Sequence, residues 1–156
     1  MSSTTVDGSY RVALDTNLLV YAEGVNGAAK RDSAIALIER LPRGSVVIPV
    51  QVLGELMRVL TGKAGRGIAE ARGMLLEWRD AFALAPTTER VFWTALDLAV
   101  DHQFRIWDGV IFGAAVEAGC RLLLTEDLQD GFTAHGTTVA NPFASTLHPL
   151  LAAILT

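Results

Sequence analysis

The sequence predicts an α/β fold in which a mainly parallel sheet is covered by helices on both faces. Short apolar segments rich in β-branched residues alternate with longer segments whose apolar residues recur at the helical period. This alternation is typical of β-α-β units, which place parallel strands side by side under helices. The 156 residues, 51% of them apolar, are enough for one domain with a well-filled core.

The elements follow from where each apolar run begins and ends. The strands are short and end at a polar residue, a proline or a turn signal. The predicted strands are residues 11–14, 46–48, 82–85, 121–124 and 137–140. The predicted helices are residues 18–22, 28–41, 50–60, 68–80, 88–100 and 108–117. No internal repeat or low-complexity linker divides the chain, so a single domain is expected.

Apolar periodicity also predicts which side chains face the core. In the second and third helices these are Ala34, Ile35, Leu37, Ile38, Leu41, Val50, Leu53, Leu56, Met57 and Leu60. The segment 108–117 is apolar nearly all round, so the whole helix is expected to be buried. The tryptophans Trp78, Trp93 and Trp107 are spaced like core residues.

Charge and cysteine content limit the classes of function. The formal net charge is −4 with only 13 lysines and arginines, so any nucleic-acid contact is expected to be local or metal-mediated. The single cysteine, Cys120, cannot form an internal disulfide and lies in an apolar run that favours burial. No segment is apolar for long enough to span a membrane. A soluble, cytoplasmic protein with a flexible arm at residues 1–10 is expected.

Acidic residues occur at or near the ends of the predicted strands. Asp15 directly follows the first strand, and Asp127 lies shortly after the strand at 121–124. Asp108 opens the buried helix, and Glu55 lies on the helix after the second strand. Because ligands of parallel sheets bind beyond the carboxyl ends of the strands, these acids are candidates for one common site.

Each acid also has a structural interpretation that involves no ligand. Asp15 and Asp108 are both placed to cap the first turn of a helix, since a short carboxylate accepts the free N–H groups there. Asp127 can be an ordinary loop acid. Glu55 lies at the margin of its helix, where a solvated position is the better interpretation for that residue alone.

Carboxylates gathered at one edge of a sheet would raise one another's pKa unless a cation neutralised them. Carboxylate oxygens without histidine or cysteine partners suit Mg²⁺ or Mn²⁺. The histidines, His102, His135 and His148, are too scattered for a zinc motif. A Mg²⁺ site keeps water positions open and can orient a phosphate and an attacking water, so phosphodiester hydrolysis is the natural reaction.

Four segments of the chain resemble, in order, the acidic motifs of PIN-domain nucleases. They are Ala-Leu-Asp-Thr-Asn-Leu-Leu-Val-Tyr at 13–21, Gln-Val-Leu-Gly-Glu-Leu at 51–56, Trp-Asp-Gly-Val-Ile-Phe-Gly-Ala-Ala at 107–115 and Leu-Thr-Glu-Asp-Leu at 124–128. The run Val-Ala-Asn-Pro-Phe at 139–143 is similar to the family's common ending. Each motif alone is weak, whereas four in order across residues 11–143 are a specific signal.

The resemblance implies a three-layer α/β/α fold, Mg²⁺ or Mn²⁺ dependence and endoribonuclease activity. It implies that Asp15 and Asp108 are the principal metal ligands, that Glu55 completes or tunes the site, and that Asp127 binds metal directly or through water. Asn17 and Thr125 would hold these groups by hydrogen bonds. The neighbouring acids Glu126 and Asp130 leave the fourth ligand open. Residues 144–156 are expected to pack on the same domain.

A single-domain chain of this size looks most like the VapC-type toxin of a toxin-antitoxin pair. That likeness implies a small antitoxin protein as partner, an RNA substrate and a homodimer. Two alternatives remain open: a PIN-like module that binds RNA or a partner without catalysis, and an RNA-processing nuclease that is not a toxin. A phosphatase with Asp15 as nucleophile is disfavoured, because its pattern needs an aspartate where this chain has Asn17.

Residues 58–79 carry five basic and two acidic side chains. Arg58, Lys63 and Arg66 are therefore candidate RNA contacts that would steer a polyanion toward an acidic site. A solvated pair of helices with mixed charge is the more common explanation of such a pattern. The glycine-rich run at 62–67 lacks the order of a phosphate-binding loop.

Overall fold

Six strands form the central sheet of the computed structural model, which describes residues 10–156. The strands are β1 (Arg11–Leu14), β2 (Val46–Pro49), β3 (Ala83–Ala85), β4 (Cys120–Leu124), β5 (Thr133–Ala134) and β6 (Thr137–Ala140). Their order in the sheet is β3-β2-β1-β4-β6-β5, and every neighbouring pair is parallel except β5 and β6. The predicted α/β class and mainly parallel sheet are confirmed.

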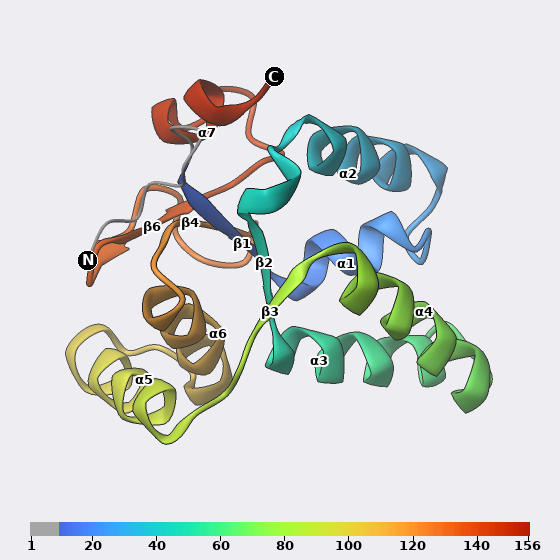
Figure 1. Ribbon diagram of the computed structural model, residues 1–156, viewed down its shortest axis with the longest axis horizontal. Helices are drawn as coiled ribbons and strands as arrows, with labels where there is room; N and C mark the ends of the chain where they lie inside the picture. The colour runs from blue at the N-terminus through green and yellow to red at the C-terminus, as the bar shows by residue number, and fades with distance from the viewer. Residues whose placement is uncertain (1–9) are drawn as a thin grey trace.

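The helices cover the sheet on both faces. They are α1 (Thr16–Ala22), α2 (Ala28–Arg40), α3 (Val50–Thr61), α4 (Ile68–Ala81), α5 (Glu89–His102), α6 (Ile106–Glu117) and α7 (Pro149–Ile154), with a 3₁₀ turn at Arg43–Ser45. Figure 1 shows α1 to α4 on one side of the strands and α5 and α6 on the other. The strands between these layers are buried on both faces, which explains why their sequences are continuous apolar runs.

Most predicted elements agree with the structure to within two residues. The helix expected from Asp108 begins earlier, at Ile106, so Asp108 lies inside its first turn. The two-residue strand β5, the 3₁₀ turn and α7 were not predicted. Such short elements carry too few residues to show a period of their own.

Several side chains expected in the core are exposed instead. Ile35 is 37% exposed and Val50 is 42% exposed, while Trp93 and Trp107 are 56% and 53% exposed. The buried side of α5 consists of Val91, Ala95 and Leu98, and Trp93 lies outside this set, with its N–H donating to Glu89 Oε2 over 3.1 Å. Helices α5 and α6 pack closely, since a Cβ added to Gly113 would lie 2.9 Å from the Val91 carbonyl oxygen.

The other exceptions lie at the ends or edges of helices. Val50 is the first residue of α3, and Trp107 precedes the buried stretch 109–115 of α6. Ile35 borders a surface cleft between α2 and α4 rather than the sheet. Cys120, by contrast, is buried as predicted, and burial raises the pKa of its thiol to about 12.

The C-terminal residues pack on the same sheet. Leu151 and Ile154 of α7 are buried, and the Thr156 N–H donates to the Arg40 carbonyl over 3.1 Å. The Tyr10 hydroxyl donates to the Leu150 carbonyl, which ties the start of β1 to α7. The rest of the expected N-terminal arm, residues 1–9, lies outside the described residues. Within residues 10–156, no helix has both the length and the apolar character needed to cross a bilayer.

Candidate active site

The candidate site lies where the chain reverses its direction across the sheet. From β1 the chain moves through α1 and α2 to β2 on one side, and later returns to β4 on the other side. The carboxyl ends of β1 and β4 therefore meet at a switch point, the usual position of ligand sites in open parallel sheets. The Asp15 N–H donates to the Leu124 carbonyl over 3.0 Å, so the two strand ends are joined directly.

Asp15 ends β1 and caps α1. Its Oδ1 accepts the Thr16 N–H over 2.7 Å, which confirms the helix-capping interpretation. Only 6% of the residue is exposed. Burial raises the pKa of Asp15 to about 6, and the negative charges of Glu55 and Asp127 add to this effect, while Thr125 and the Thr16 N–H oppose it. The side chain thus stabilises the helix and also carries an unusually basic carboxylate.

Glu55 is half-buried, although periodicity alone favoured a solvated position. It accepts a hydrogen bond of 2.5 Å from the Thr16 hydroxyl at the start of α1. Its neighbours on α3, Val52 and Leu56, are fully buried, so the helix margin lies against α1 rather than facing open solvent. The Thr16 hydroxyl therefore holds the Glu55 carboxylate beside Asp15.

The fourth motif is connected to the first by Asn17. The Asn17 amide nitrogen donates to the Thr125 hydroxyl and to Asp127 Oδ2, each over 3.0 Å. The Asp127 N–H also donates to the Thr125 hydroxyl over 3.0 Å. Asn17 Oδ1 is buried and has no hydrogen-bond partner among the described residues. A buried acceptor without a donor is costly, so this oxygen is suited to a cation or a bound water.

Asp108 approaches from the opposite layer. It is a half-buried residue of the first turn of α6, whose N-cap is Arg105, so the capping interpretation of Asp108 is wrong. Burial raises the pKa of Asp108, and the negative charge of Asp127 adds to the rise, while Arg105 opposes it. The charges of Asp108, from α6, and Asp127, from the loop after β4, therefore repel one another across the site.

All four predicted acids line a single cleft of about 310 Å³. Its lining residues are Asp15, Thr16, Asn17, Val20, Tyr21, Asn26, Glu55, Arg58, Val59, Asp108, Glu126 and Asp127. Thr125 lies just beneath, fully buried. We refer to this cleft as the acidic cleft.

The acids near Asp127 differ in their surroundings. Glu126 lines the acidic cleft, accepts a hydrogen bond from the Tyr21 hydroxyl, and has its Oε2 3.8 Å from Lys30 Nζ. Asp130 instead accepts the Asn141 N–H over 2.9 Å and is not among the residues that line the cleft. Asp127 and Glu126 therefore face the cleft, while the Asp130 carboxylate stabilises a loop.

The three candidate RNA contacts also differ. Arg58 lines the acidic cleft. Lys63 is exposed nearby, with its Nζ 3.4 Å from Asn26 Oδ1, and Asn26 lines the same cleft. The Arg66 guanidinium instead contacts the Glu23 carbonyl and the Met74 sulfur, each at 3.2 Å, which directs it away from the acids. Arg66 is the weakest of the three candidates.

The donor chemistry of the acidic cleft fits a hard divalent cation. Asp15 and Asp108 offer carboxylate oxygens whose pKa values are raised, and Asn17 Oδ1 offers a buried acceptor without a donor. Within residues 10–156, no group of at least three histidine, cysteine or acidic side chains is arranged to hold one ion. Mg²⁺ commonly takes one or two carboxylates and keeps several waters, so the fit is to a water-rich site.

Sequence reasoning missed three polar residues of the acidic cleft. Thr16 and Tyr21 each orient a glutamate, and Asn26 forms part of the wall. A signal existed for Tyr21, since it follows Asn17 by four residues and so shares a helix face with it. For Asn26, in the turn between α1 and α2, the sequence holds no comparable signal.

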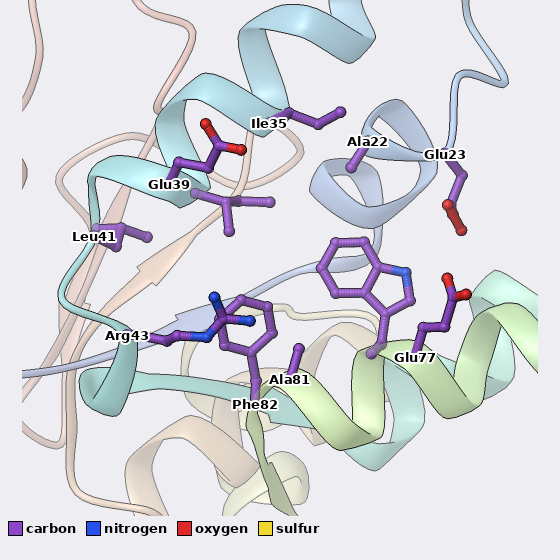
Figure 2. A pocket seen from close by; sticks show the side chains of 11 residues that line it. Ala22, Glu23, Ile35, Glu39, Leu41, Arg43, Glu77, Ala81 and Phe82 are labelled. Carbon is purple, nitrogen blue, oxygen red and sulfur yellow. The ribbon is translucent and has the colours of Figure 1, made fainter.

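A second cleft, of about 400 Å³, lies between α1, α2 and α4 (Figure 2). Its floor is largely apolar, and Trp78 and Phe82 stack within it with ring centroids 6.0 Å apart. Figure 2 shows the carboxylates of Glu23 and Glu77 pointing toward one another at one end. Glu23 Oε2 is buried without a hydrogen-bond partner among the described residues, and burial raises the Glu23 pKa. We refer to this feature as the apolar cleft.

Comparison with known proteins identifies the fold independently. Among solved structures, a toxin-antitoxin complex from Klebsiella pneumoniae superposes with a TM-score of 0.64 at 18% identity, covering 85% of this chain and 98% of that chain. The VapC20 toxin of Mycobacterium tuberculosis, titled as cleaving the sarcin-ricin loop, gives a TM-score of 0.60 at 20% identity, covering 72% and 86%. A DNA-bound VapBC from Salmonella typhimurium gives 0.56 at 15% identity, covering 83% and 96%.

At these identities the structures establish similarity of fold. A search of curated protein sequences found no significant match. The PIN domain family matches residues 12–133, a span that includes Asp15, Glu55, Asp108 and Asp127. Because this span covers more than half of the chain, the protein belongs to the PIN domain family.

Proposed function

We propose that this protein is a Mg²⁺- or Mn²⁺-dependent endoribonuclease that hydrolyses RNA phosphodiester bonds. The observation that carries the proposal is the convergence of Asp15, Glu55, Asp108 and Asp127 on one cleft, although they come from four separate segments of the chain. The buried, partnerless oxygen of Asn17 and the raised pKa values of Asp15 and Asp108 support a cation there.

Each residue of the acidic cleft would have a separate role in hydrolysis. Asp15 and Asp108 would hold the cation, and Asp127 would complete the site directly or through water, in the position that Asn17 gives it. Glu55, whose carboxylate accepts the Thr16 hydroxyl, would accept a proton from an attacking water. The bound cation supplies charge for the phosphate oxygens and lowers the pKa of its water. Arg58 would contact the neighbouring RNA backbone.

The test is cleavage of a mixed pool of structured RNA by the partner-free protein in Mg²⁺, in Mn²⁺ and in EDTA. Asp15→Asn and Asp108→Asn should abolish cutting while retaining the native circular dichroism spectrum. Asp97→Asn, a change to an exposed acid of α5 outside the cleft, should cut like the wild type. Intact RNA under every metal, with protein that is folded and binds RNA, would instead favour a non-catalytic binding module.

We further propose that the protein is the toxin of a toxin-antitoxin pair and that a small antitoxin protein occupies the apolar cleft. Several structures of similar fold are titled as toxin-antitoxin complexes. The cleft presents Ile35 and Phe82 beside Glu23 and Glu77, so it suits a partner segment with an apolar side chain next to a lysine or arginine. Such a cation would satisfy Glu23 Oε2, which has no partner among the described residues.

Co-expression with the product of a small adjacent open reading frame tests the pairing. Glu23→Gln and Ile35→Ser should each weaken the complex, because one removes the charge and the other the exposed apolar contact. Neither change lies in the acidic cleft, so RNA cutting by the free protein should persist. If both variants bind the partner as tightly as the wild type, the partner does not occupy the apolar cleft.

The homodimer implied by the resemblance and the cytoplasmic location remain proposals. The exposed apolar side chains Phe92, Trp93 and Val100 along α5 are the surface that we would test for self-association. Light scattering on the wild type and on Trp93→Ser would decide it, since a dimer that uses this face should dissociate in the variant.

A further inference from the structure

A third cleft adjoins the acidic cleft and shares two of its residues. It has a volume of about 450 Å³, and its walls are the end of α5, the connection 103–105 and the loop that follows Asp127. Asp108 and Asp127 line both clefts. These two carboxylates therefore form the boundary between the acidic cleft and this third cleft. An extended ligand can cross the boundary and occupy both clefts. We refer to this third cleft as the flanking cleft.

The walls of the flanking cleft offer aromatic surface and amide groups. Phe104 and Phe132 are half-buried, with ring centroids 5.2 Å apart, and both pack against the fully buried Phe112. His102 packs edge-on against Phe132 at 5.0 Å. Because Phe112 anchors the group, the aromatic floor is part of the core and is fixed in place.

Gln103 and Gln129 both line the flanking cleft and are exposed, and the Gln103 amide nitrogen donates to the Val100 carbonyl over 3.4 Å, which leaves its amide oxygen free to accept. An amide both donates and accepts hydrogen bonds, which suits the edge of a nucleobase. Gln103 also has a left-handed backbone, with φ of 58°, at the C-cap of α5. Glycine or asparagine is the usual residue in this left-handed conformation. Glutamine therefore occupies a backbone conformation that it rarely adopts.

A positively charged arginine side chain lies on each side of the boundary that Asp108 and Asp127 form. Arg58 lines the acidic cleft, and Arg105 lines the flanking cleft and is close enough to Asp108 to lower its pKa. The acids between them, Asp108 and Asp127, repel phosphate in the absence of a cation. An RNA backbone that crosses this boundary can therefore place one phosphate near each arginine and the scissile phosphate between them.

We propose that the flanking cleft binds the nucleotide next to the scissile phosphate of a single-stranded RNA. The base packs on the floor of Phe104 and Phe132, Gln103 and Gln129 contact its edge, and Arg105 contacts the adjacent phosphate. The inference rests on the proposed nuclease function, and what it adds is a base-selecting site beside the scissile phosphate. A paired base cannot enter such a cleft, since its edge is already occupied, so the base bound there must be unpaired.

The first experiment measures binding without cleavage. Fluorescence anisotropy in EDTA follows a labelled single-stranded RNA of random sequence and the same pool annealed to its complement. The single strand should bind more tightly. Arg105→Ala should weaken its binding about tenfold and lower the salt slope by about 0.7, as expected for one lost phosphate contact. Arg90→Ala removes the same charge from the far end of α5 and should leave binding unchanged.

The second experiment reads base preference from sequenced cut sites in a random RNA pool with Mg²⁺. Gln103→Gly removes the side chain and suits the left-handed backbone, so the variant should be at least as stable as the wild type. It should flatten the preference at one position beside the cut and leave the other positions unchanged. Gln129→Ala should flatten the same position, because both amides face one base.

The outcomes separate this inference from the proposed nuclease function. If no variant or wild-type protein cuts RNA, yet Arg105→Ala still weakens single-strand binding, the binding site stands and the nuclease proposal fails. If cutting is normal and both glutamine variants keep the wild-type base preference, the flanking cleft does not select a base. If the three substitutions weaken only the complex with a protein partner, the cleft is a protein-binding surface and the inference is wrong.

Discussion

Asp15 has two structural roles: it caps helix α1, and it lines the acidic cleft. Its Oδ1 caps α1 through the Thr16 N–H, while the residue is almost wholly removed from solvent beside Glu55 and Asp127. Ionising a buried carboxylate next to two other acids is unfavourable, and this explains its pKa of about 6. Deprotonation of Asp15 is therefore unfavourable in the native protein unless a cation, as proposed above, offsets the charge.

We predict that the metal-free protein loses stability as pH rises from about 4 through about 6. The unfolded chain releases the Asp15 proton near pH 3.8, whereas the native state holds it until about pH 6, so deprotonation favours unfolding in this window. The loss should approach about 3 kcal/mol at most. Urea unfolding in EDTA at a series of pH values measures it.

Asp15→Asn is the matched control for this prediction, because asparagine caps a helix about as well as aspartate but does not ionise. Its free energy of unfolding should fall less between pH 4 and 6 than that of the wild type, and what remains should come from the raised pKa values of Asp108 and Glu23. If both proteins show the same pH profile, another group is responsible.

At the residue scale, the sequence predicted that these acids gather at one place, and they do line one cleft, but it did not predict how they are held. Asp15, Asp108 and Asp127 could be found because each lies at a strand end or a helix start. The inward position of Glu55 depends on the Thr16 hydroxyl, a contact between residues 39 positions apart that periodicity cannot reveal. The partnerless Oδ1 of Asn17 likewise appears only when the rotamer and its neighbours are known.

At the element scale, the contact between α5 and α6 determines the position of Asp108, which lies in the first turn of α6. These helices approach closely at two glycines of α6: a Cβ on Gly109 would lie 3.1 Å from the Ala95 carbonyl oxygen, and one on Gly113 would lie 2.9 Å from that of Val91. Backbone atoms cannot move aside as a flexible side chain can. A Cβ at either position would therefore force the two helices to shift relative to one another.

We predict that Gly113→Ala destabilises the protein by about 1–3 kcal/mol, the usual cost of overpacking a core. Gly73→Ala on α4 is the control, since a Cβ there meets nothing within 4 Å and alanine is the better helix former by about 1 kcal/mol. Denaturant unfolding of both variants measures the difference. Equal stability of Gly113→Ala and the wild type would mean that the helices separate without cost.

The helix contact also explains why sequence patterns misplaced some elements and side chains. Apolar periodicity treats Trp93 as core because it counts hydrophobicity and ignores the space available. The α6 segment is apolar all round, so its period could not indicate its first turn, and the start at Ile106 was missed. Helix α1 likewise begins two residues earlier than predicted, whereas the boundaries of α2, α3 and α4 agree with the structure to within one residue.

At the scale of the whole molecule, the strand order brings the four motifs together. The sequence predicts parallel strands, but nothing in it states that β4 pairs with β1 rather than extending the sheet beyond β3. That pairing places Asp15 beside Thr125 and Asp127, and it leaves an acidic cleft between two helical layers. A cation that bridges the layers should therefore stabilise the entire domain.

We predict that Mg²⁺ raises the thermal midpoint of unfolding in a concentration-dependent way. An ion that binds only the native state adds about 1.4 kcal/mol for each tenfold increase in concentration above its dissociation constant. Differential scanning fluorimetry across a Mg²⁺ series should show this rise for the wild type and for Asp97→Asn, and little of it for Asp15→Asn. A rise of the same size in Asp15→Asn would locate the ion elsewhere.

The two glycines of α6 also determine how the acidic cleft and the flanking cleft are spaced. Asp108 is carried by α6, while Gln103 and Arg105 follow the end of α5, so the distance between these helices fixes how far Asp108 lies from the walls of the flanking cleft. If the proposed nuclease function and the proposed base-binding site are correct, this distance sets the offset between the bound base and the bond that is cut. A change of buried packing at either glycine would then move the cleavage position without altering any residue proposed to contact RNA.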